Sequence, residues 1–446
     1  MVLGRIAACL AFALVLAFGS DAKASPEDIF GYGGRTSAMG ATGTAHASGY
    51  EAAWHNPALA SKTRANKLTL GYMGGVLRLD AVGNGLPGRV NVAPVKGFLI
   101  GAEIPVPFRG KLADRVGLAL AFYTPSDVIV RGRVLYPEKT QFPMLAERGQ
   151  SVTIRGGAGA DIGWGVRLGA GFAALAEIEG NVVAATDATG RVGTQVETQL
   201  VATYAPVLGA SWELPKEWGT HLHLGLAYRG ELDARFAVII DGTKLSTLAI
   251  PLFNISGLAQ YDPAQLAFEA ARIDGLNVLA LQFVYKKWSS FPGVLEPTVV
   301  CSEGGAGACG LVPPTIEWGD TFAVRLGAEQ GFRLAPGVTL RGRGGGFFET
   351  TPLPSTIPGS EAFDVPSKQV LEVPTRYFDS SRLAFTTGIG LGLGRPLPPI
   401  DLDLYAQVHF LLPRTVTSTD FAGGPLSQGE ASGHMTMFGM TAGVKF

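Results

Sequence analysis

The segment Asp401-Leu-Asp-Leu-Tyr-Ala-Gln-Val-His-Phe410 alternates between polar and apolar side chains. A period of two places the apolar residues on one face of a β-strand and the polar residues on the other. About ten residues is also the length with which a tilted strand crosses the apolar layer of a membrane. The segment therefore predicts a strand, either of a soluble sandwich with an apolar core or of a barrel whose apolar face meets lipid.

Similar alternation recurs along most of the chain, and we predict fourteen strands. The connections between them also alternate in length: short ones such as 107–114 and 334–337 take turns with long ones such as 123–150 and 289–318. Short periplasmic turns and long external loops are typical of an outer-membrane barrel, so this pattern favours the barrel over the sandwich. The predicted strands are 66–76, 95–106, 115–123, 151–163, 166–179, 194–213, 220–237, 263–272, 276–288, 320–334, 337–349, 381–394, 400–412 and 434–446.

The composition supports the same class. Charged residues are 16% of the chain, below the ~25% of ordinary soluble proteins, and there are 61 glycines among 446 residues. The net charge of −1 offers no basic surface for nucleic acid. Beyond the first residues no apolar run reaches the ~20 residues that a spanning helix needs. We therefore expect an all-β, antiparallel transmembrane barrel.

Both ends of the sequence point to export. An apolar run over 6–18 is followed by Ala22-Lys-Ala24, which predicts a signal peptide over residues 1–24. Cys9 precedes most of this apolar run, which argues against a lipoprotein signal. The last predicted strand ends at Phe446, as strands that carry the assembly signal of outer-membrane barrels do. We expect an integral protein of the outer membrane of a Gram-negative bacterium.

A barrel of fourteen strands encloses an aqueous lumen unless something fills it. Residues 25–63 precede the first predicted strand and are long for a tail without a role. We therefore predict a signal peptide over 1–24, an N-terminal hatch, or plug, over 25–63 and the barrel with long external loops over 64–446.

Several motifs resemble the FadL and TodX family of outer-membrane transporters for hydrophobic compounds. Gly34-Arg35 and Asn56-Pro57-Ala58 are similar to elements of the family's N-terminal hatch. Trp288-Ser-Ser-Phe291 is similar to a strand end of the family, and residues 318–354 to its paired strands and Pro-containing loop. The resemblance covers most of the chain from Gly34 to Phe446 and is weakest over 126–150.

The resemblance implies a function and a route. It implies transport of hydrophobic small molecules, above all long-chain fatty acids, by loop capture, rearrangement of the hatch and lateral release through the third strand. In that strand Gly117, Ala119 and Ala121 are small, which leaves room for a wall opening or, equally, for a packed plug. General or aromatic-hydrocarbon porin activity and an outer-membrane lipase are the alternatives.

Candidate ligand sites follow from charge and hydropathy. The external segment around 245–258 is apolar for a loop and predicts either a landing groove for the ligand or a helix packed on other loops. Arginines predicted to face the lumen could bind a carboxylate head group, although a charge network within the lumen is the commoner role of such residues. The residues proposed for these sites are Leu245, Leu248, Leu252, Phe253, Arg325, Arg341 and Arg343.

Other chemistry finds little support. The sequence lacks the nucleophile-elbow, Walker and zinc-protease motifs, so we expect no enzyme activity, no cofactor and no metal. His221 and His223 alone are a weak metal site. Cys301 and Cys309 share one predicted external loop, and we expect a disulfide between them. The expected partners are the hydrophobic ligand, outer-membrane lipid and the barrel assembly machinery.

Overall fold

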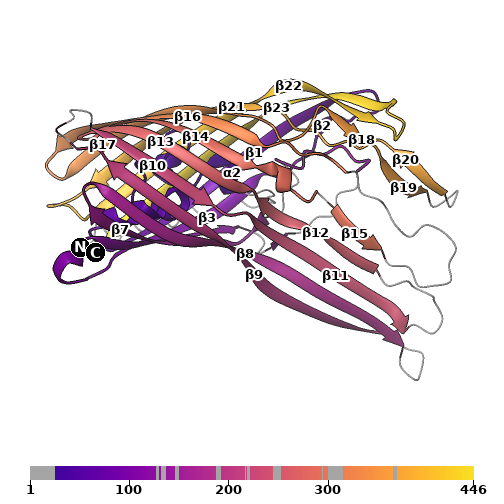
Figure 1. The fold of residues 1–446 in the computed structure, drawn as a ribbon, viewed down its shortest axis with the longest axis horizontal. Helices are drawn as coiled ribbons and strands as arrows, with labels where there is room; N and C mark the ends of the chain where they lie inside the picture. The colour runs from indigo at the N-terminus through magenta and orange to yellow at the C-terminus, as the bar shows by residue number, and fades with distance from the viewer. Residues whose placement is uncertain are drawn as a thin grey trace.

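The molecule is an elongated barrel, drawn with its long axis horizontal in Figure 1. Its structure is a computed structural model. It describes residues 26–126, 130–131, 137–145, 150–186, 192–215, 217, 221–244, 253–293, 295–299, 315–364 and 369–446. The predicted signal peptide over 1–24 lies outside the described residues.

Fourteen antiparallel strands form a closed wall, which confirms the predicted fold class. Each strand pairs with the next, and the first pairs with the last from Lys67↔Lys445 to Gly83↔Gly429. The wall has no free edge because this last pairing closes it. Its strands are β1 (Lys67–Gly83), β3 (Val95–Pro105), β4 (Val116–Pro125), β7 (Thr153–Gly163), β8 (Val166–Thr186), β9 (Val192–Glu213), β10 (Leu222–Arg229), β13 (Ala264–Asp274), β14 (Asn277–Lys287), β16 (Thr321–Ala335), β17 (Val338–Glu349), β21 (Arg382–Leu393), β22 (Ile400–Thr419) and β23 (Pro425–Lys445).

The outer surface of the wall is apolar. On β14, for example, Leu279, Leu281 and Phe283 are exposed, whereas the intervening Ala280 and Gln282 are buried. Alternation of this kind, with the apolar residues outside, is the pattern of a barrel surrounded by lipid. Within the described residues no helix is long and apolar enough to span a bilayer.

The two ends of the barrel differ in their connections. Short turns such as those joining β7 to β8 and β16 to β17 lie at one end, on the left of Figure 1, together with the C-terminus. Long connections extend from the other end and carry β2 (Gly88–Val90), β5 (Val130–Arg131), β6 (Gln150–Ser151), β18 (Thr356–Pro358), β19 (Ser360–Asp364) and β20 (Gln369–Val373).

The seventh strand departs from the prediction. We predicted one strand over 220–237, but β10 ends at Arg229 and the chain then leaves the wall. The pairing of β9 with β10 stops beside Pro206, which has no amide hydrogen to continue the ladder. Beyond it, β11 (Leu232–Lys244) runs parallel to β8 and pairs on its other side with β12 (Phe253–Asp262), which pairs with β15 (Leu295–Val299).

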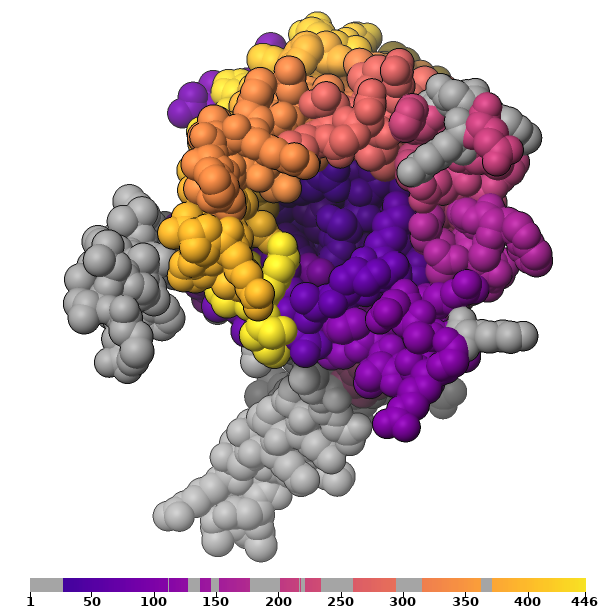
Figure 2. Space-filling view, turned by 90° about the vertical axis from the view of Figure 1, so that its left-hand side faces the viewer, coloured from indigo at the N-terminus to yellow at the C-terminus, as the bar shows by residue number. Residues whose placement is uncertain are grey.

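The residues before β1 lie inside the barrel. From Glu27 to Ser61 every residue is buried except Arg35, which is half-buried, and Ser48, which is exposed. Figure 2 looks into the end with the short turns and shows this segment, in indigo, as the floor of a hollow. It forms α2 (Pro26–Phe30), α3 (Gly34–Ser37), η2 (Gly49–Glu51), α4 (Ala52–His55) and η3 (Pro57–Lys62).

Glycines of the wall allow this segment to approach the strands closely. A Cβ atom at Gly117 would lie 2.1 Å from the carbonyl oxygen of Ala60, and one at Gly209 would lie 1.9 Å from Oδ1 of Asn56. No side chain can be accommodated at such distances. The high glycine content of the sequence therefore serves, at these positions, the packing of residues 26–63 against the wall.

Candidate functional site

The lumen around the N-terminal segment (residues 26–63) is the candidate functional site. Glu269 of β13 accepts hydrogen bonds from the backbone amides of Gly43 (2.6 Å), Thr44 (2.8 Å) and Ala45 (3.1 Å). Three consecutive amides that point at one carboxylate form a concave anion-binding turn. A single side chain of the wall thus satisfies three buried donors of the segment.

A second attachment is the ion-pair chain that begins at Arg35. Its guanidinium donates to both carboxylate oxygens of Glu329 at 2.9 to 3.1 Å. Arg343 bridges the same carboxylate (2.6 Å) and Asp403 (2.5 Å). Bidentate arginine–carboxylate pairs fix orientation as well as charge. Of the predicted head-group arginines, Arg343 is thus engaged in holding the wall around the segment.

The Asn56-Pro57-Ala58 element attaches the segment to β9. Asn56 Oδ1 accepts a hydrogen bond from the amide of Ala58 (3.1 Å), and Pro57 begins η3. This is the stiff local turn that the sequence predicts. The side-chain amide also donates to the carbonyl oxygens of Thr44 (2.7 Å) and Ala210 (2.9 Å), and the second of these bonds reaches the wall.

Trp54 is enclosed by aromatic and cationic groups. It stacks on Tyr32 with ring centroids 5.6 Å apart. The guanidinium carbons of Arg155 and Arg229 lie 3.8 Å and 4.7 Å from its ring centroid. Cations over an indole face are attracted by its quadrupole. Arg229, predicted to face the lumen, does so, while Glu231 is exposed beyond the end of β10.

A charged network lies nearer the end with the long loops. Lys286 contacts Asp28 of the N-terminal segment (3.0 Å) and Glu349 of β17 (2.6 Å), and Glu349 also pairs with Arg382 (2.6 Å). All four side chains are buried. Because buried charges are costly unless they are paired, this network holds the start of the segment against β14 and β17.

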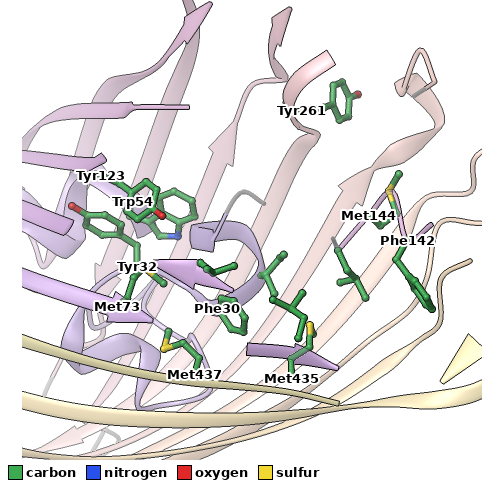
Figure 3. Packing of buried hydrophobic residues seen from close by; sticks show 14 of the residues in the cluster. Phe30, Tyr32, Trp54, Met73, Tyr123, Phe142, Met144, Tyr261, Met435 and Met437 are labelled. Atoms are coloured by element: carbon green, nitrogen blue, oxygen red, sulfur yellow. The ribbon is translucent and has the colours of Figure 1, made fainter. Parts of the chain in front are cut away.

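The opposite side of the lumen is apolar. Figure 3 shows buried apolar side chains in a row, from Trp54 and Tyr32 past Phe30 and Met437 to Met144 and Phe142. We call this set the apolar column. Its members are Phe30, Tyr32 and Trp54 of the N-terminal segment, Met73, Leu77, Leu79, Leu99, Tyr123, Met435 and Met437 of the wall, and Phe142, Met144 and Leu145 of the long connection between β4 and β7.

The remaining predicted arginines differ in their surroundings. Arg325 is buried, donates to the carbonyl oxygen of Ala41 (2.9 Å) and lies over the ring of Phe347. Arg341 is half-buried and lines a cavity of about 570 Å³ at the end with the short turns. The structure therefore brings Arg341 and Arg343 to the lining of one cavity, whereas Arg325 lies outside it.

The small residues of the predicted lateral opening face inward. Ala119 and Ala121 are buried, and Gly117 contacts η3. β4 is paired with β3 on one side and with β7 on the other. In this structure the three positions form a packing surface for the N-terminal segment.

Two predicted features lie outside the described residues. The first is the proposed groove: Leu245, Leu248 and Leu252 are not described, and Phe253 is described only as the first residue of β12. Cys301 and Cys309 also lie outside, so the groove and the disulfide stay predictions. Among the described residues no group of three or more His, Cys, Asp and Glu is placed to hold a metal ion.

Burial changes the acid–base properties of the N-terminal segment. Desolvation raises the pKa of Glu51 to about 7, although the Arg35 charge and the amides of Arg35 and Thr36 oppose the shift. The pKa of Glu27 is also raised to about 7, by desolvation and by the charge of Asp262. Desolvation lowers the pKa of His46 and His55, so both imidazoles stay neutral.

Comparison with known proteins gives the fold. No family model matches the chain, and no curated protein matches its sequence. A Pseudomonas aeruginosa FadL homologue aligns over 93% of this chain and 97% of its own, with a TM-score of 0.56 at 15% identity. This chain has the FadL-type fold. The P. putida toluene transporter TodX aligns over 94% of this chain and 99% of its own, with a TM-score of 0.55 at 13% identity.

Sequence reasoning missed most partners of the FadL-type lumen. Glu269 carries no local motif, since its three amide donors lie more than 220 positions away. Lys286 lies in the predicted strand 276–288, but its pairing with Asp28 was not predicted. The sequence did contain one indication. Glu269 and Lys286 are charged residues at inward positions of otherwise apolar strands, and buried charges in a barrel are costly unless they are paired.

Proposed function

We propose that this chain is an outer-membrane transporter of hydrophobic small molecules, with long-chain fatty acids as the first candidate substrates. The observation that carries the proposal is the apolar column, which runs along the lumen of a barrel that is apolar outside. A dozen methylene groups that move from water into such surroundings contribute about 10 kcal/mol. The tail would therefore set the affinity.

Aromatic hydrocarbons are the second candidate substrates. The similar TodX barrel is described as a toluene transporter, and the column contains aromatic as well as aliphatic side chains. A general porin would need an open aqueous lumen, whereas residues 26–63 lie across this one. A lipase would need a nucleophile and base that face the membrane, which the sequence did not suggest.

We further propose that residues 26–63 act as a hatch. A ligand that follows the column from the loops meets Phe30, Tyr32 and Trp54 before it reaches the other end. Movement of the segment would break its bonds to Glu269 and Glu329, so we expect partial displacement near Phe30 rather than expulsion of the whole segment.

Release sideways into the outer leaflet completes the proposal. A hydrophobic ligand gains nothing by entering the aqueous periplasm, and a side exit keeps its surface covered. An opening beside Gly117, Ala119 and Ala121 would require β4 to part from β3 or β7 and from the N-terminal segment. Outer-membrane lipid would then receive the ligand, and the barrel assembly machinery is the expected partner in biogenesis.

Uptake of radiolabelled oleate and toluene by cells that lack their own transporters tests the proposed function. Cells with the wild-type chain should take up at least one probe faster than cells with the empty vector. Met435→Glu should abolish this gain because it places a charge in the column, whereas the volume-conserving Met435→Leu should keep it. No gain with either probe would refute the proposal for these substrates.

The lateral route needs a separate experiment. Ala119→Trp with Ala121→Trp should slow uptake in an assembled barrel, while Leu120→Trp, which is on the outer face of the same strand, should not. Assembly is checked by the change in gel mobility on boiling. Unchanged uptake with both inward tryptophans would place the exit elsewhere.

A further inference from the structure

The connection between β4 and β7 sends a short segment into the mouth of the barrel. In this segment, Pro137-Glu-Lys-Thr-Gln-Phe-Pro-Met-Leu145, Phe142 is 0% exposed, Met144 5% and Leu145 4%. Loops ordinarily cover a surface with polar groups. Here three large apolar side chains of a loop are members of the apolar column, the same buried cluster that contains wall residues such as Met435.

Backbone hydrogen bonds attach the segment to another loop. The amide of Gln141 donates to the carbonyl of Arg376 (3.1 Å), and the amide of Phe378 donates to the carbonyl of Gln141 (2.9 Å). A third bond joins the amide of Arg376 to the carbonyl of Pro137 (2.8 Å). The rings of Phe142 and Phe378 are 6.1 Å apart. These three backbone bonds join two loops, and none of them belongs to the ladders of the barrel wall.

The inner end of the segment is imperfectly packed. Met144 and Leu145 border a small cavity of about 30 Å³ together with Trp288, and the charged Asp28, Glu349 and Arg382 line its other side. Met144 and Leu145 therefore lie next to the charged network, separated from it by this cavity. Well-packed interiors leave few such voids.

We propose that Phe142, Met144 and Leu145 occupy the volume in which the apolar part of the ligand binds, and that the ligand displaces them. The inference rests on the proposed transport of hydrophobic molecules and names the site for their alkyl or aromatic portion. The segment and the ligand compete for one buried apolar cluster, to which Leu79 and Met435 of the wall belong. With such competition, the apparent affinity equals the intrinsic affinity multiplied by the fraction of molecules in which the segment has left the site.

The sign of a mutational effect tests the inference. Truncation of a residue that lines a ligand site weakens binding, whereas truncation of a residue that fills the site strengthens it. The triple variant Phe142→Ala, Met144→Ala, Leu145→Ala should bind radiolabelled dodecanoate or toluene about tenfold more tightly than the wild type, in lipid nanodiscs by equilibrium dialysis. The matched wall variant Met435→Ala, Met437→Ala should bind more weakly.

A reversible lock provides a second measurement. Gln141 and Tyr377 face each other across the bridge between the two loops. With Cys301 and Cys309 replaced by serine, Gln141→Cys with Tyr377→Cys should reduce binding of the same probes when oxidised, and reductant should restore it. The single Gln141→Cys variant controls for the substitution.

The outcomes separate this inference from the proposed function. Tighter binding by the triple variant and redox-dependent binding by the locked variant support displacement. Weaker or unchanged binding by the triple variant, in a barrel of normal heat-modifiable mobility, overturns displacement while leaving transport intact. Absence of probe binding in the wild type and in every variant overturns the proposed function, and this inference with it.

Discussion

The two halves of the lumen hold the N-terminal segment in different ways. On β13, β14 and β16 the inward side chains include charged groups, and these bind backbone amides, Arg35 and Asp28. On β1, β3, β4 and β23 they are largely apolar and contact Phe30 and Tyr32. The difference teaches that one wall provides directional attachment, while the other provides a surface that a hydrophobic ligand can share.

The largest effect is expected from the charged half. Glu269→Ala would leave the amides of Gly43, Thr44 and Ala45 without their acceptor, at a local cost of about 5 kcal/mol. Hydrogen exchange of residues 43–45, followed by mass spectrometry, should become much faster. Glu269→Gln keeps one acceptor oxygen and should have a smaller effect. Equal protection in the alanine variant would contradict the role assigned to Glu269.

A matched change in the apolar half should act on a different part of the segment. Met437 is fully buried, and Met437→Ala should cost about 3 kcal/mol through lost contacts and the cavity left behind. Exchange should accelerate over 29–32, near Phe30, and stay unchanged over 43–45. If exchange over 29–32 and over 43–45 accelerates equally in Met437→Ala and in Glu269→Ala, the N-terminal segment opens as one unit. The two halves of the lumen then do not hold separate parts of it.

Asn56 lies away from both halves, against β9, and sharpens the comparison. Asn56→Ala removes three hydrogen bonds and should cost about 2 kcal/mol. We expect brief openings that pass small ions, visible as an increased conductance in planar bilayers, with binding of apolar probes retained. Asn56→Asp keeps the bond to Ala58 but loses both amide donors, so its conductance should also increase.

The smallest effect is a pH dependence. The pKa of Glu51 is about 7 in the folded protein and 4.5 when the carboxyl is exposed. The folded state therefore keeps a proton that the exposed group loses, so the stability that the neutral carboxyl contributes is complete below pH 4.5 and decreases as the pH rises to 7. Glu51→Gln mimics the neutral form.

Relative to the wild type, this variant should protect residues 34–37 equally at pH 4.5 and better at pH 8. The comparison between the two proteins cancels the opposite pH dependence of the neutral, buried His46 and His55. If the two proteins differ in hydrogen-exchange protection at pH 4.5 and agree at pH 8, the pKa of Glu51 is not raised in the folded protein.

The sequence predicted the wall well because a barrel strand has a simple periodicity. All fourteen strands of the wall overlap a predicted one, since lipid and lumen impose a two-residue alternation on each. β10 overlaps its prediction but is shorter, because it ends where Pro206 interrupts the partner strand, a non-local effect that periodicity does not register. Strands such as β22, which continues to Thr419, also extend beyond their predicted ends.

The lumen was harder to predict. Alternation assigned Arg325 and Arg343 to the inside, but it gave no information on their partners, which come from strands and segments far away in the chain. Gly34, Arg35 and the Asn56 turn were recognised from a resemblance and from local turn chemistry. Residues 137–145 gave no periodic signal, so their insertion into the apolar column was not anticipated.

The pairing of β1 with β23 has a consequence for biogenesis. These strands form the seam of the wall, and residues 26–63 directly precede β1. A segment that fills the lumen and touches strands all around it has to be inside before the seam forms, because its two attachments to Glu269 and Glu329 lie across the barrel from that seam. Pairing between residues so distant in sequence is slow to form. We therefore expect the seam to close last, around an interior that was arranged while the wall was still open.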